Sequence, residues 1–172
     1  MKKTLFTLML MLASVMTINA QSLTSNPWMA VSDELKDAVL MLSFEDDGTC
    51  VMVMAGEMVE EDAGMKMVIS MAAKLPGSYI LKGKDLTISF DKDKAEFNFD
   101  YDIQGVDEQT KKLIDAMIKP ELEKQKPEMK KMLKDAPFFN GETFKVVSID
   151  NEKLILTDSN GVENVFVAVP NE

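Results

Sequence analysis

Histidine and arginine are both absent from this sequence of 172 residues, and Cys50 is its one cysteine. Histidine is the commonest general base and metal ligand, and arginine is the usual bidentate partner of phosphate and carboxylate groups. Their absence excludes Ser-His-Asp triads, histidine-ligated zinc and arginine clamps. A single cysteine cannot form an internal disulfide bond. Because Cys50 begins an apolar run, we expect a buried thiol.

The N-terminus has the pattern of a secretory leader. Lys2 and Lys3 precede a mostly apolar run that ends at Asn19-Ala20-Gln21. The run has about 15 residues, fewer than the roughly 20 that span a membrane, and no cysteine at the cleavage point could accept a lipid. We predict a signal peptide over 1–20 and a mature domain over 21–172, exported to the periplasm or secreted, and soluble.

Negative charge dominates the chain, and removing Lys2 and Lys3 with the leader takes the net charge from −10 to −12. A nucleic-acid partner is not expected, because phosphate binding needs a cationic face. The segment 106–135 differs, with eight lysines and seven acidic residues. Its lysines either form a solvated helix face or meet an anionic membrane surface or an envelope protein.

Strict alternation of polar and apolar residues marks most of the chain as β-strand. The clearest case is the stretch Ala95–Ile103, in which every second residue is apolar or aromatic. Similar patterns mark 65–71, 86–90 and 144–149, and shorter or more apolar runs cover 38–44, 50–55, 78–81, 154–157 and 162–169. Turn residues separate these runs, and Pro76-Gly77 is expected to be one such turn.

About nine short antiparallel strands expose an edge unless the sheet closes. We therefore predict a mostly β fold, an antiparallel lipocalin-like barrel of about eight to ten strands, with an open sandwich as the alternative. The helical insert, over 106–136, falls before the last three strands. Pro120 and Pro127 favour two or three short helices over one, because proline prefers the first turn of a helix.

Acidic side chains provide the remaining candidates for chemistry. Clusters such as Glu45-Asp46-Asp47 could hold calcium, but the loop that starts at Asp91 has Glu96 where an EF-hand has glycine. Paired carboxylates could also serve glycoside hydrolysis, although sequence spacing does not establish their separation. We expect solvated surface acids, and therefore no enzyme, no catalytic residues, no metal and no cofactor.

Methionines crowd one part of the domain, where Met52, Met54, Met65, Met67 and Met71 alternate along strands. Thioether side chains fill irregular cores and also adapt to varied apolar ligands. Two interpretations remain open, an ordinary packed core and a lined cavity.

Short motifs along the chain resemble the lipocalin-like proteins that bacteria secrete. They are Asn26-Pro27-Trp28, Phe44-x-x-Asp47-Gly48-Thr49, Pro76-Gly77-Ser78-Tyr79, Leu86-Thr87-Ile88 and Lys153–Asp158 with Gly161. The resemblance implies a calycin-type barrel with an apolar cavity, whose closed end is plugged by the opening tryptophan, Trp28. Asn26 stands where the family has glycine, and the arginine that packs against that tryptophan is absent here.

These observations predict a non-enzymatic protein that binds a small apolar or amphipathic molecule in a barrel cavity. The residues expected to face that ligand come from three strands and from the helical insert, which is expected to cover one barrel end. They are Met52, Met54, Met67, Ile69, Phe97, Phe99, Tyr101, Leu113 and Met117. The alternative is a filled barrel that recognises another envelope protein and has no small-molecule ligand.

Overall fold

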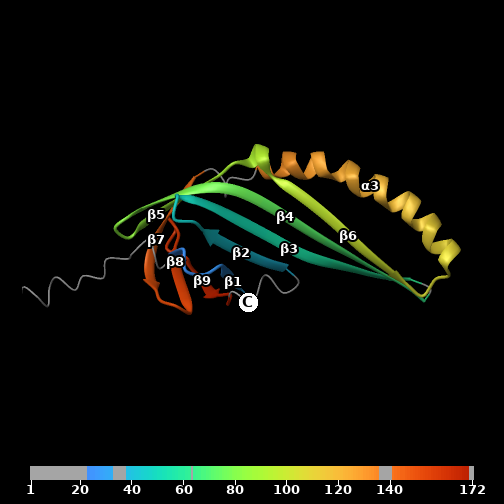
Figure 1. The fold of residues 1–172 in the computed structure, drawn as a ribbon, viewed down its shortest axis with the longest axis horizontal. Coiled ribbons are helices and arrows are strands. Elements are labelled where there is room, and N and C mark those ends of the chain that lie inside the picture. The colour runs from blue at the N-terminus through green and yellow to red at the C-terminus, as the bar shows by residue number, and fades with distance from the viewer. Residues whose placement is uncertain (1–22, 33–37, 63, 136–140, 171–172) are drawn as a thin grey trace, which may run out of the picture.

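The computed structural model describes residues 23–32, 38–62, 64–135 and 141–170, so the predicted signal peptide lies outside the described residues. Within these residues the fold has nine strands and one long helix (Figure 1). The strands are β1 (Trp28–Val31), β2 (Ala38–Phe44), β3 (Thr49–Asp62), β4 (Met65–Lys82), β5 (Asp85–Phe90), β6 (Glu96–Gln104), β7 (Glu142–Ile149), β8 (Lys153–Thr157) and β9 (Glu163–Ala168). A short 3-10 helix, η2 (Lys92–Lys94), precedes β6, and α3 (Glu108–Asp135) follows it.

Eight of the strands close into an antiparallel barrel. Their order around the barrel is β1, β2, β3, β4, β5, β7, β8 and β9, and β9 pairs again with β1. Closure leaves these strands without the unpaired edge that an open sheet would have. The predicted fold class is confirmed, a mostly β closed barrel with its helix before the last three strands.

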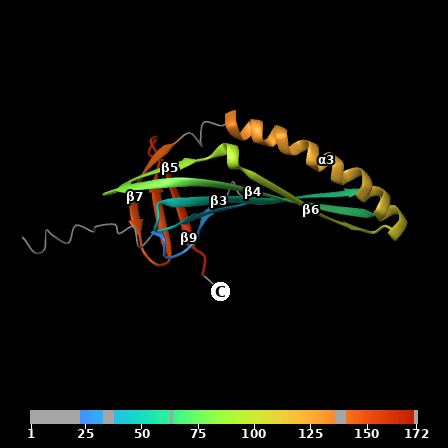
Figure 2. The same ribbon diagram turned by 45° about the horizontal axis from the view of Figure 1, so that its top comes forward.

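Two strands are longer than the barrel and carry a sheet beyond it. β3 and β4 remain paired as far as Asp62 and Met65, and β6 pairs with residues 66–74 of β4. We call residues 56–62, 65–74 and β6 together the extension. Figures 1 and 2 show the extension projecting to one side of the barrel, with α3 lying along it. β6 is therefore not a strand of the closed barrel.

The predicted turn at Pro76-Gly77 is wrong, because both residues lie inside β4. On one edge β4 pairs with β6 up to Lys74 and with β5 from Gly77 onward. Pro76 has no backbone N–H to donate, and it stands where the neighbouring strand changes. Its carbonyl accepts the N–H of Asp91 at 2.8 Å. A Cβ on Gly77 would lie 2.5 Å from the Ser89 carbonyl oxygen, so glycine is needed for this close approach.

The helical insert is one helix of 28 residues, and the prediction of two or three short helices is wrong. Asp107 caps its start, because one side-chain oxygen accepts the N–H groups of Gln109 and Thr110. Pro120 and Pro127 lie inside the helix, both exposed. They are seven positions apart and therefore share the outer face, where lost hydrogen bonds let the helix curve over the sheet (Figure 1).

Leucines from β4, β5 and β8 belong to the buried core of the barrel. Leu75, Leu86 and Leu154 have no exposed surface. Cys50 packs in the same cluster with 1 % of its surface exposed, so the predicted buried thiol is confirmed. Burial raises the pKa of this thiol to about 11, which keeps it protonated at neutral pH.

Candidate ligand-binding site

One end of the barrel is hollow. A cavity of about 460 Å³, here called the barrel cavity, lies among inward side chains of seven strands. Its apolar lining consists of Ala30, Val31, Leu40, Leu42, Met52, Ile88, Phe90, Phe144, Leu156, Val162, Val165 and Phe166. The cavity opens where β1 ends and β9 begins, since Val31 and Glu163 both line it. Its volume lies within the range of small-molecule sites in proteins.

Polar side chains meet the barrel cavity at its rim. Glu142 and Glu163 are the first residues of β7 and β9, and both line the opening together with Ser32 and Asn164. Among the described residues, neither glutamate forms an ion pair and no lysine lines the cavity. The opening therefore has negative charge beside an apolar interior.

Trp28 occupies the other end of the barrel. It is the first residue of β1 and has no exposed surface. Its indole Nε1 donates a hydrogen bond to the carbonyl oxygen of Leu23, which is equally buried. Trp28 does not line the barrel cavity, and its role as the plug that the resemblance implies stays a prediction.

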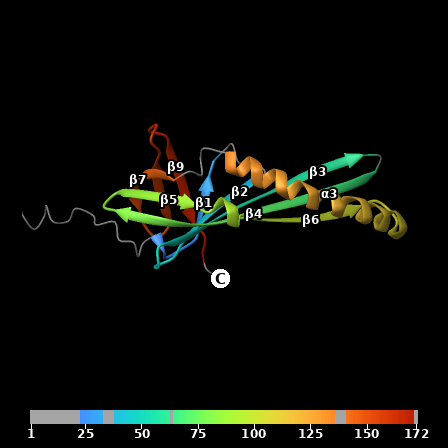
Figure 3. The ribbon, with the colours of Figure 1, turned by 90° about the horizontal axis from the view of Figure 1, so that it is seen from above.

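A second hollow lies between the extension and the end of α3. This helix hollow has a volume of about 350 Å³. Its lining is Ala38, Met54, Ala55, Gly56, Met71, Ala73 and Phe97 from the strands and Met129, Met132 and Leu133 from α3. Figure 3 shows α3 crossing over the extension. Met54 of the helix hollow is the cross-strand partner of Leu40 in the wall of the barrel cavity, so neighbouring residues of β2 and β3 line the two hollows.

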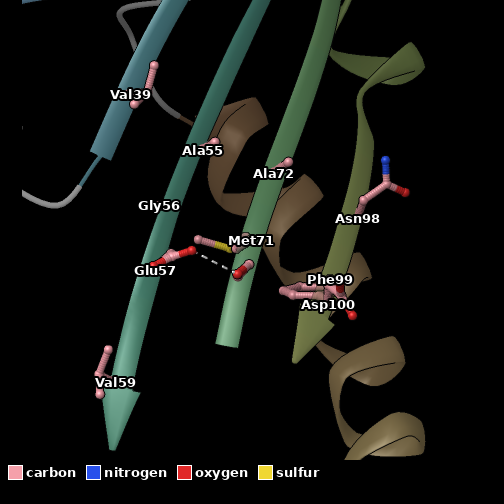
Figure 4. Close-up of a pocket in the computed structure, with 11 residues that line it drawn as sticks. Val39, Ala55, Gly56, Glu57, Val59, Met71, Ala72, Asn98, Phe99 and Asp100 are labelled. Carbon is pink, nitrogen blue, oxygen red and sulfur yellow. Dashed lines mark hydrogen bonds between the residues drawn. The ribbon is translucent and has the colours of Figure 1, made fainter. Parts of the chain in front are cut away.

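A groove runs along the opposite face of the extension. This outer groove has a volume of about 840 Å³ and a floor of small residues that includes Ala55 and Ala72. Figure 4 shows Glu57, Asn98 and Asp100 along it, with α3 behind the sheet. Ser70 Oγ donates a hydrogen bond to Glu57 Oε1 at 3.3 Å. The groove is shallow and exposed, unlike the barrel cavity.

The strand residues predicted to face a ligand do share one face of the sheet. Met52 lines the barrel cavity, whereas Met54 and Phe97 line the helix hollow. The register places Phe99 opposite Met71, Tyr101 opposite Ile69, and Ile103 opposite Met67. Met67, Ile69, Phe99 and Tyr101 therefore lie on the extension, outside the barrel interior in which they were expected.

The expected inward orientation of Leu113 and Met117 is wrong. Their side chains are 63 % and 74 % exposed. The face of α3 toward the sheet contains Ile114, Ile118, Leu122, Met129 and Leu133 instead, of which Leu122 and Leu133 are buried. Burial, and after it a hydrogen bond to Asp115, raises the pKa of Tyr101, so this part of α3 also meets β6.

The sequence interpretation missed most of the cavity wall. Ile88, Phe144 and Leu156 belong to strands that were predicted, and alternation had already given each strand a buried face. Alternation shows which side chains of a strand are buried, but it does not show which strands face one another across the barrel. The predicted ligand-facing residues therefore come from the two methionine-rich strands, the strand over 95–103 and the helical insert, and not from the strands of Ile88, Phe144 and Leu156.

Reactive groups are scarce around these hollows. In the part of the chain that the structure describes, no three His, Cys, Asp or Glu side chains are grouped to hold a metal ion. None of the helices in those same ranges is both long and apolar enough to cross a membrane. The chemistry available at the barrel cavity is apolar contact, with carboxylates at the rim. The sequence matches no protein-family model and no curated protein.

Proposed function

We propose that this protein is a non-enzymatic binder of a small apolar or amphipathic molecule, held in the barrel cavity. The observation that carries the proposal is an apolar space of about 460 Å³ inside a closed barrel, open at one end. Burial of apolar ligand surface there is favourable by roughly 25 cal/mol per Å² before the costs of association. A completely filled barrel would offer no such space.

Membership of the secreted lipocalin-like group belongs to the same proposal. Its support is the closed eight-stranded antiparallel barrel together with the buried Trp28 near the start of the chain. Export and solubility after cleavage rest on the leader pattern over 1–20. The mass of the exported protein should correspond to a chain that starts at Gln21, and a product that retains residues 1–20 would contradict the leader.

Uptake of the neutral probe Nile red tests the binding function. Ala30 lines the barrel cavity, whereas the side chain of its neighbour Met29 alternates to the outside of β1. Ala30→Phe should weaken probe binding by about tenfold or more, because the added ring occupies part of the cavity. A tenfold loss corresponds to only ~1.4 kcal/mol of binding free energy. Met29→Phe is the matched control and should bind as the wild type does. No uptake by the wild type would contradict the proposal.

The alternative is an interaction protein, and the outer groove favours it. The groove lies on an exposed sheet face, and Val39 and Val59 along it are 45 % and 52 % exposed. Apolar residues on an open face are typical of protein contacts. A wild type that takes up no apolar probe, but loses a partner from its own cell envelope on Val59→Asp substitution, would favour this second function.

A further inference from the structure

We infer that the helix hollow and the barrel cavity form one binding site, and that its ligand is an elongated single apolar chain rather than a compact ring system. The inference rests on the proposed binding function and adds the ligand class. It also gives α3 a part in binding, through the last turns of the helix.

One continuous face of the sheet borders both hollows. Met52 lines the barrel cavity and Met54 lines the helix hollow, two residues further along β3. Residues two apart on a strand point to the same side. Leu40, in the cavity wall, is the cross-strand partner of Met54. Neighbouring residues on the inner faces of β2 and β3 therefore line the two spaces.

The second step concerns the chemistry of the helix hollow. All of its lining residues are apolar, and no charged side chain from the described part of the chain borders it. Met54, Met71, Met129 and Met132 contribute flexible thioethers, which adapt to a chain without a fixed shape. A ligand of this kind leaves no polar group unsatisfied there.

The combined shape of the two hollows is elongated. The barrel cavity alone holds a compact ligand, whereas the helix hollow adds about 350 Å³ displaced along the sheet. Only a molecule that is long relative to its width reaches from one into the other. Each further methylene buried in the hollow is expected to tighten binding by about fourfold, which corresponds to about 0.8 kcal/mol.

The experiment is a chain-length series on the full mature protein. Monoacylglycerols from octanoyl to octadecanoyl, each below its micelle concentration, displace Nile red from the wild type. We expect affinity to rise with chain length beyond the length that fills the barrel cavity, and then to reach a plateau. An affinity that stops rising at the shortest chains would overturn the single-site inference.

A filling variant shows which hollow receives the far end of the chain. Ala73 lines the helix hollow, whereas Ala72 lies on the opposite face of β4, in the outer groove. Ala73→Leu should move the plateau to shorter chains and leave the affinity for octanoylglycerol unchanged. Ala72→Leu is the matched control and should keep the plateau of the wild type.

A second variant avoids the buried position. Met132 borders the helix hollow and is 66 % exposed, so Met132→Ala should fold normally. We expect a loss of roughly threefold for octadecanoylglycerol and none for octanoylglycerol. Met117→Ala, on the exposed face of α3, should change neither affinity.

The outcomes separate this inference from the proposed function. Absence of binding at every chain length would overturn the binding function itself. Tight binding of short chains with the same plateau in the wild type and in Ala73→Leu would leave the binding function in place and overturn the inference.

Discussion

The indole Nε1 of Trp28 lies 2.8 Å from the carbonyl oxygen of Leu23, and neither residue has any exposed surface. A buried donor and a buried acceptor each lose their contact with water, so each depends on the other. The hydrogen bond fixes the segment before β1 across the end of the barrel. Closure of that end therefore depends on one side-chain contact as well as on packing.

Replacement of Trp28 by Phe should destabilise the fold by about 1–3 kcal/mol, because the Leu23 carbonyl is left buried without a donor. Urea unfolding followed by circular dichroism measures the change, since the variant has no tryptophan fluorescence. Ile80→Leu, at an exposed strand position, is the control and should unfold with the wild type. Equal midpoints for Trp28→Phe and the wild type would contradict the role of this contact.

Two phenylalanines on β6 should differ in their contributions to stability. Phe97 is 7 % exposed and packs with the core, so Phe97→Ala should cost about 3–5 kcal/mol. Phe99 is half-buried, with Lys126 Nζ 5.9 Å from its ring centroid. Phe99→Ala should cost about 1 kcal/mol, because less apolar surface is lost. Denaturant unfolding of both variants checks the order, and equal losses would be inconsistent with it.

The Cys50 thiol should make stability depend on alkaline pH. Burial raises its pKa from the ordinary value of 9.0 to about 11 in the fold. The folded protein prefers the protonated thiol, and this preference adds to the free energy of unfolding. The contribution is fully present below pH 9.0 and is lost as the pH rises toward about 11. Other groups titrate in this range, so the measurement is the stability of the wild type relative to Cys50→Ala. A difference that stays constant with pH would refute the prediction.

Charge at the rim should decide which amphiphiles enter the barrel cavity. Glu142 and Glu163 line the opening, and in the described part of the chain no lysine does. We expect dodecylammonium to bind more tightly than dodecanoate, by roughly three- to tenfold, as exposed charge pairs allow. The double variant Glu142→Gln with Glu163→Gln should bring the affinities for dodecylammonium and dodecanoate closer together. The control Glu128→Gln, on α3, should leave the ratio of the two affinities unchanged. Calorimetry measures both affinities. Stronger binding of dodecanoate by the wild type would count against this account.

Alternation along single strands was the most informative part of the sequence. The pattern over Ala95–Ile103 predicted β6 and its apolar face, and the structure has both. It could not predict that β6 leaves the barrel, because the partner of a strand is set by distant residues. Pro76-Gly77 has the composition of a turn, and only the change of neighbour from β6 to β5 explains its place inside β4.

The helix was harder to orient from its sequence. The apolar residues of α3 fit more than one stripe, and Leu113 and Met117 belong to the stripe that faces solvent. The stripe that packs has Leu122 and Leu133, and it spans both prolines. Packing against the extension accounts for one continuous helix where local preference favours a break.

The pairing of β1 with β9 sets an order of events for the newly made chain. Trp28 lies opposite Ala168, so β1 can pair with β9 only after the C-terminal part of the chain has been made. The long β3–β4 hairpin joins neighbouring segments of the chain and needs no distant partner. Local pairings of this kind form faster than those between distant residues. A chain that stops before residue 163 lacks the closing strand and would keep both edges of its sheet open to other chains.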